Sequence, residues 1–80
     1  METNQIHRRL TAVFRDIFDR PDLEITRDTT SADIEDWDSL ANISLIVALE
    51  KDFSISFTLK EVQALTNVGG MLDLIKVKTG

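Results

Sequence analysis

The 80-residue chain has no cysteine and only one histidine, and both shortages restrict its chemistry. Without cysteine it can form no disulfide, no thiolate nucleophile and no thiolate metal site. His7 alone cannot make a histidine-rich metal site, and we expect it to be a solvated residue of the first helix. No apolar run approaches the ~20 residues of a membrane span. The polar start Met-Glu-Thr-Asn-Gln is unlike a signal peptide, so we expect a cytoplasmic protein.

Positive charge is also scarce. Fourteen acidic residues against nine Lys and Arg give a formal net charge of −5, which argues against a nucleic-acid partner because such partners need a basic surface. Between Asp28 and Glu50 there are six acids and no Lys or Arg. This stretch can steer a basic partner protein toward it, or it can be an ordinary solvated acidic loop.

The first half of the chain predicts one helix and a long connection. Apolar residues recur at helical spacing over residues 4–19, Thr3 or Asn4 can cap this helix, and Pro21 ends it. The connection over residues 20–38 is long for a compact domain, and such connections are usually functional. Three apolar residues are expected to anchor it in the core: Leu23, Ile25 and Ile34.

The second half predicts three more helices. One covers residues 39–53, and a short one follows Thr58 and extends through Leu65, with Glu61 placed for a capping box. Asn67 can cap the last helix. The predicted fold is therefore all-α, a small bundle of three main helices plus a short helix, with a long loop between the first two helices.

The helix predicted over residues 39–53 is apolar on two sides. At about 100° per residue, one side forms a stripe that we expect in the core: Leu45, Ile46, Leu49 and Phe53. The opposite side carries Leu40, Ile43 and Val47. A domain of this size rarely buries a helix on both sides, so we expect the second set to be an exposed partner surface. Alternatively, Leu40 or Ile43 folds under the long loop.

Ser39 is the most informative residue, since it opens this helix directly after Asp36-Trp37-Asp38. Its hydroxyl would be exposed near the positive end of the helix dipole, a favourable position for a phosphate ester. Alternatively, Ser39 or Asp38 is only a helix cap. We expect Trp37 to be a half-buried packing residue.

These features together resemble the acyl carrier protein family over essentially the whole chain. The resemblance rests on size, acidity, the helix order, Asp38-Ser39-Leu40 at the start of the second helix, and Leu49-Glu50-x-x-Phe53-x-Ile55 at its end. It implies a single carrier domain over residues 1–80 that is not itself an enzyme. In that family the serine matching Ser39 carries 4′-phosphopantetheine, which a phosphopantetheinyl transferase takes from coenzyme A. The cofactor's thiol then holds acyl or aminoacyl groups as thioesters, which suits a chain without cysteine.

The resemblance also implies a docking face and a set of partners. Asp38 would contact the basic transferase, and Leu40, Ile43 and Val47 would form the hydrophobic part of the face. Further partners would be a ligase that loads the acyl or aminoacyl group and downstream transferases or synthases, acting on a monomer that needs no metal.

Some positions differ from carriers of primary fatty acid synthesis, whose second helix is usually more acidic. Here the matching positions hold Ala41, Ser44 and Lys51. The Trp-Asp-Ser-Leu form instead resembles stand-alone carriers of specialised pathways, which serve polyketide or lipid assembly or carry a small acid or an amino acid. The sequence does not choose among these.

Two other functions are compatible with the residues alone. The chain can be a non-carrier acidic helical adaptor in which Ser39 is only a cap. A more distant alternative is a metal-binding loop built on Asp33, Glu35, Asp36 and Asp38, although the spacing lacks the glycine and the terminal glutamate of an EF-hand.

Overall fold

The computed structural model describes residues 2–80, and these form helices joined by loops and turns, with no strand among them. The helices follow in the order α1 (Thr3–Ile17), α2 (Ser39–Phe53), α3 (Leu59–Ala64) and α4 (Val68–Thr79). The predicted all-α bundle of three main helices and a short one is therefore confirmed. None of these helices is both long and apolar enough to cross a bilayer.

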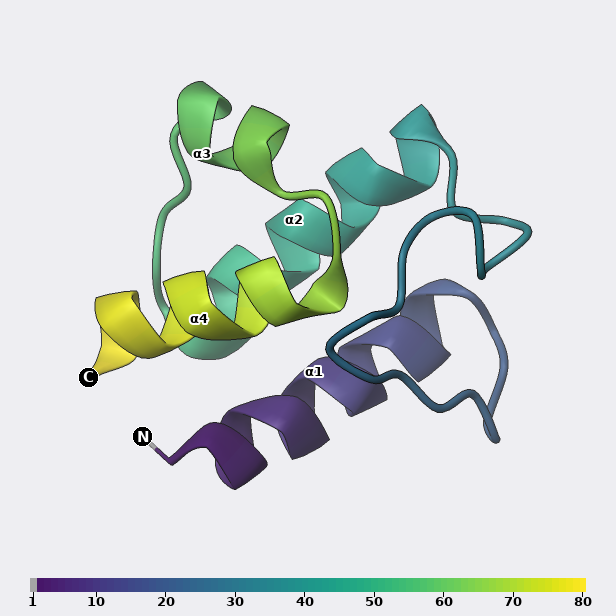
Figure 1. Cartoon of the computed structure of the whole chain (residues 1–80), viewed down its shortest axis with the longest axis horizontal. Helices are drawn as coiled ribbons and strands as arrows, with labels where there is room; N and C mark the ends of the chain where they lie inside the picture. The colour runs from purple at the N-terminus through teal and green to yellow at the C-terminus, as the bar shows by residue number, and fades with distance from the viewer. Residues whose placement is uncertain (1) are drawn as a thin grey trace.

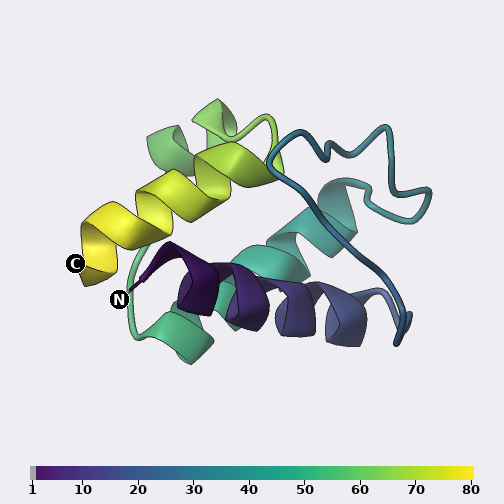
Figure 2. The ribbon, with the colours of Figure 1, turned by 60° about the horizontal axis from the view of Figure 1, so that its bottom comes forward.

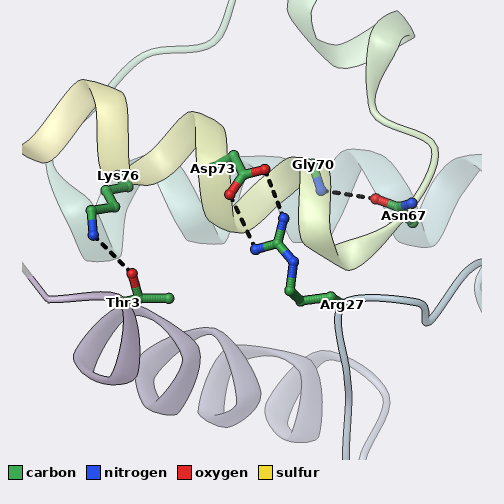
Figure 3. Close-up of polar contacts among 6 residues, drawn as sticks. All are labelled: Thr3, Arg27, Asn67, Gly70, Asp73 and Lys76. Carbon is green, nitrogen blue, oxygen red and sulfur yellow. Dashed lines mark hydrogen bonds and ion pairs between the residues drawn. The ribbon is translucent and has the colours of Figure 1, made fainter.

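The start of α2 lies at one end of the molecule. The start of α1 and the end of α4 lie at the opposite end (Figures 1 and 2). α1 packs against both α2 and α4, and it runs in the opposite direction to each of them (Figure 1). The Lys76 ammonium donates a hydrogen bond to the Thr3 hydroxyl at 2.9 Å (Figure 3). This bond ties the end of α4 to the start of α1.

Two of the predicted helix starts have the capping interactions that their sequences indicate. The Thr58 hydroxyl accepts from the Glu61 N–H at 3.1 Å, and the Glu61 carboxylate accepts from the Thr58 N–H at 2.9 Å, which completes a capping box. The Asn67 side chain accepts from the Gly70 N–H at 2.8 Å (Figure 3). Local side-chain chemistry therefore suffices to begin α3 and α4.

The start of α1 differs from the prediction. Neither Thr3 nor Asn4 caps it, because both already belong to the helix and Glu2 is the capping residue. The Glu2 backbone N–H donates to the Gln5 side chain at 3.1 Å, which satisfies a group that the helix itself leaves unpaired. Glutamate is an uncommon cap, and the preference for Thr and Asn favoured the wrong residues.

The end of α1 also comes earlier than predicted, at Ile17 rather than at residue 19. Asp19 adopts the left-handed conformation with φ of 52°, and the Arg20 N–H then bonds to the Arg15 carbonyl at 3.0 Å. A left-handed residue followed by such a backbone hydrogen bond is a common way for a helix to end. The helix therefore ends before Arg20, the residue whose backbone Pro21 restricts.

One hydrophobic core joins the first helix, the second, the last and the long loop. Ile25 and Ile34 of the loop are buried, and Leu23 packs against the core from a half-buried position, so the three predicted anchors hold. The remaining buried apolar residues of this core come from the helices and, for Phe18, from the residue that follows α1: Ile6, Leu10, Phe14, Phe18, Leu45, Leu49, Phe53, Val68, Met71, Leu72 and Ile75. Each fully buried side chain of this kind contributes roughly 1.5–3 kcal/mol.

The long loop is also attached to α4 through polar contacts. The Val68 N–H donates to the Thr29 carbonyl, and the Gly69 N–H to the Arg27 carbonyl, each at 2.9 Å. Arg27 adds a two-pronged ion pair to Asp73, with N···O distances of 3.1 and 2.8 Å (Figure 3). A Cβ at Gly69 would lie 3.0 Å from the Arg27 carbonyl oxygen, so this close approach favours glycine.

His7 is not the solvated residue that we expected. It is half-buried, and its Nε2–H donates to the Ile25 carbonyl at 2.8 Å. Arg15 makes a similar bond from its Nε to the Leu23 carbonyl at 2.7 Å. Both residues of α1 thereby hold the loop against the bundle, and the partners are carbonyl groups that a sequence pattern does not reveal.

Candidate functional site

The site begins with Asp38, which is the cap of α2. Its backbone is extended, and its carboxylate accepts from the Ala41 N–H at 2.8 Å. Ser39 is the first helical residue and is exposed, and its hydroxyl makes no hydrogen bond within residues 2–80. The structure therefore assigns the capping role to Asp38 and leaves the Ser39 hydroxyl available for chemistry.

The position of Ser39 suits a negatively charged substituent. α2 has 15 residues, so its aligned peptide dipoles place a partial positive charge at the N-terminus, where the first N–H groups lack intrahelical partners. A phosphate ester on the Ser39 oxygen would lie beside those groups. The residues present thus fit a phosphate-linked cofactor.

Several carboxylates of the acidic stretch around Ser39 already have partners within the chain. Arg20, from outside the stretch, pairs with Asp36 at 3.3 Å. Asp33 accepts from the Thr30 N–H at 2.9 Å, and Glu50 accepts from the Phe57 N–H at 2.8 Å at the far end of α2. Part of the negative charge is therefore used locally.

Leu40, Ile43 and Val47 form an exposed apolar strip on α2, which we call the Leu40 strip. Their exposed fractions are 74%, 62% and 44%, respectively. The alternative in which Leu40 or Ile43 folds under the long loop is therefore wrong. The other side of α2 is buried as predicted, through Leu45, Ile46, Leu49 and Phe53.

Trp37 is half-buried and packs on the core, as expected. Its ring meets Phe14 edge to face, with centroids 5.2 Å apart and an interplanar angle of 87°. A second aromatic contact, to Phe18, has a centroid distance of 6.3 Å. The indole N–H donates to the Asn42 side-chain oxygen at 3.0 Å. The ring is therefore fixed both by packing and by a hydrogen bond.

An open hollow of about 290 Å³ lies beside Ser39. Its lining residues are Ser31, Trp37, Asp38, Ser39 and Asn42. Sequence reasoning missed two of these, Ser31 and Asn42. A signal for Asn42 existed, because it stands three positions after Ser39 and thus on the same side of the helix, whereas only the folded loop brings Ser31 there.

The acids proposed for a metal-binding loop do not converge. No group of three or more His, Cys, Asp or Glu side chains within residues 2–80 is placed to hold a metal ion.

Comparison with known proteins places the chain in a family. The family described as "Phosphopantetheine attachment site" matches residues 8–75, which is most of the chain. The chain therefore belongs to the phosphopantetheine-dependent carrier proteins. Its structural neighbours show that it is an acyl carrier protein, and its cofactor is covalently attached 4′-phosphopantetheine.

Two solved structures illustrate the similarity. The holo acyl carrier protein of Geobacter metallireducens is 44% identical, with a TM-score of 0.86, over 90% of this chain and 83% of that one. A proposed acyl carrier protein of Mycobacterium tuberculosis is 28% identical, with a TM-score of 0.81, over 90% of this chain and 96% of that one. A comparison with curated protein sequences gives no significant match.

Proposed function

We propose that Ser39 is the attachment residue and that the chain presents acyl or aminoacyl groups to partner enzymes. The observation that carries this proposal is the exposed Ser39 hydroxyl at the start of α2, which is left without a hydrogen bond in the described chain because Asp38 provides the cap. The thiol of the attached cofactor would hold the cargo as a thioester. No cysteine of the chain can do so, since there is none.

Attachment requires the serine oxygen to reach a bound coenzyme A on a transferase. Ser39 Oγ would form the new bond to the β-phosphorus, the bond from that phosphorus to the bridging oxygen would break, and adenosine 3′,5′-bisphosphate would leave. The serine proton would pass to a base of the transferase. The positive end of α2 would favour the phosphodiester so formed. The carrier itself performs no catalysis in this scheme.

The docking face in this proposal consists of Asp38 and the Leu40 strip. Asp38 provides an exposed charge beside Ser39, and the strip provides exposed apolar side chains over the next two to three helical turns. Charge steers the encounter, while apolar contact slows dissociation. The transferase, a loading ligase and downstream transferases or synthases would all approach this face.

We place the chain in a specialised pathway rather than in primary fatty acid synthesis. Exposed Ser44 and Lys51 give the surface of α2 less negative charge than carriers of the primary pathway usually have. A partner evolved for a strongly acidic helix would lose attraction here. Residues 1–80 act as one carrier domain in this proposal, because one core joins α1, α2 and α4. The proposal also takes this domain to be a monomer in the cytoplasm.

The proposal is tested by intact mass after incubation with coenzyme A and a phosphopantetheinyl transferase. The wild type should gain one phosphopantetheine, Ser39→Ala none, and Ser44→Ala, another exposed serine of α2, one. Because Asp38 is the cap, Ser39→Ala should lose less than the ~1 kcal/mol typical of a removed cap, which a thermal melt would check. Modification of Ser39→Ala, or none of the wild type, would refute the assignment.

A further inference from the structure

We propose that the hollow beside Ser39 receives the first, uncharged segment of the cofactor arm, with Asn42 as a positioning residue held by Trp37. This inference rests on the proposed attachment at Ser39. The segment that follows the phosphate in phosphopantetheine contains a carbon with two methyl groups, then a hydroxyl and an amide. It therefore needs an apolar wall and a few hydrogen-bonding groups close to the attachment point.

The hollow offers that combination. Trp37 provides an aromatic wall, and Ser31 and Asn42 provide polar groups, all lining the same space as Ser39. The hydroxyl of Ser31 has no hydrogen-bond partner within the described chain. An arm attached to the Ser39 oxygen begins beside this hollow, because Ser39 is one of its lining residues.

The Trp37–Asn42 hydrogen bond determines how the amide is presented. The indole N–H can only donate, so the Asn42 atom 3.0 Å away must be its carbonyl oxygen. This orientation leaves the Asn42 NH₂ group with two donors and no partner among residues 2–80. A free NH₂ group beside the attachment point suits the hydroxyl and carbonyl oxygens of the arm.

The aromatic contacts beneath Trp37 make this arrangement rigid. Phe14 is fully buried and meets the indole edge to face at 5.2 Å. Ordering of side chains is a main cost of binding, and a wall that is already fixed avoids it. Because the Trp37 ring and the Asn42 amide are both held in place, they favour a single position of the arm.

The charge in the hollow decides which part of the arm enters it. Asp38 lines the space with a carboxylate, which disfavours a second negative group. The phosphate, which would be bonded to the Ser39 oxygen, stays beside the N–H groups of the first turn of α2 that Asp38 does not cap. The neutral segment with the two methyl groups enters the hollow instead.

The test uses the holo protein and NMR, with the single tryptophan as reporter. We expect nuclear Overhauser effects between the two methyl groups of the arm and the ring protons of Trp37. We also expect acrylamide to quench Trp37 fluorescence less in the holo than in the apo form. Asn42→Asp keeps an oxygen acceptor for the indole but removes the NH₂ donors, so it should lose the Overhauser effects. Ser44→Ala, outside the hollow, should keep them.

The outcomes separate this inference from the attachment itself. If mass shows one arm on Ser39 but wild-type holo protein gives no methyl-to-indole effects, the arm lies elsewhere and the inference is overturned while the attachment stands. If the effects persist in folded Asn42→Asp and also in Asn42→Ala, Asn42 is not the positioning residue. If no arm is added to Ser39, both proposals fall together.

Discussion

Leu45, Leu49 and Phe53 on one side of α2 are buried, whereas Leu40 and Val47 on the other side are exposed. Both sides carry apolar residues, so the hydrophobicity of the side chains alone does not say which side is buried. The difference comes from the neighbours of α2, because the core that it shares with α1 covers only one side. Burial therefore depends on the partner of a surface, and an apolar side without one is available to other proteins.

The largest expected effect concerns the buried side. Leu49→Ala should lower the free energy of unfolding by roughly 2–5 kcal/mol, because it removes packed methyl groups and leaves a cavity. The matched control is Leu40→Ala, the same substitution on a side chain that is 74% exposed, which should change stability by no more than about 0.5 kcal/mol. Thermal melts of both variants measure this difference. Equal losses of stability would show that the two sides of α2 contribute equally to the fold.

The exposed side should show the opposite result. Val47→Ala should cost less than about 1 kcal/mol in stability, yet it should slow modification of Ser39 and downstream transfer, because apolar contact with the partner is lost. Val77→Ala is a matched control, since Val77 is 78% exposed but lies on α4, outside the Leu40 strip. Rates are measured for both with one transferase. Unchanged rates for Val47→Ala would remove the strip from the docking face.

A smaller effect should come from salt. Modification should slow as ionic strength rises, since exposed charges are screened beyond ~8 Å at physiological salt, mainly through a lower association rate. Asp38→Asn removes a charge but keeps a capping side chain, so it should reduce this salt dependence without unfolding α2. Rates that stay flat from low to high salt would mean that the face attracts its partners through apolar contact alone.

The smallest effect should come from acid, which acts on carboxylates of α3 and α4 rather than on either side of α2. Hydrogen bonds from Arg27 lower the pKa of Asp73, and the Thr58 N–H and then Lys78 lower the pKa of Glu61. A carboxyl pKa that is lower in the folded state adds stability above its ordinary value of about 4, and this is lost as the pH falls through the folded value.

Melts between about pH 5 and pH 2 would check this effect. The melting temperature should fall less steeply in Asp73→Asn than in the wild type, because the variant has already lost the ion pair with Arg27. The difference should be small, since both partners are exposed to water. A variant with the same acid dependence as the wild type would show that the ion pair does not contribute.

The helix starts show how far local chemistry predicts structure. Thr58 and Asn67 were identified from the sequence, because the donors that they satisfy are within three residues of them. The end of α1 was not, since Asp19 adopts a left-handed conformation that its residue type allows but does not require. The role of His7 was missed because its partner, the Ile25 carbonyl, is 18 residues away.

The sequence by itself determined the helical bundle, the buried stripe of α2 and an exposed serine at the helix start, since these follow from periodicity and capping. The choice of Asp38 over Ser39 as the cap is also local, since the donor that Asp38 satisfies is three residues away. Packing of the folded chain was needed for Arg20 to neutralise part of the acidic stretch, and for Ser31 and Asn42 to meet at one hollow. These outcomes depend on the path of the long loop, and contacts across a loop are set by the packing of the whole chain rather than by neighbouring residues.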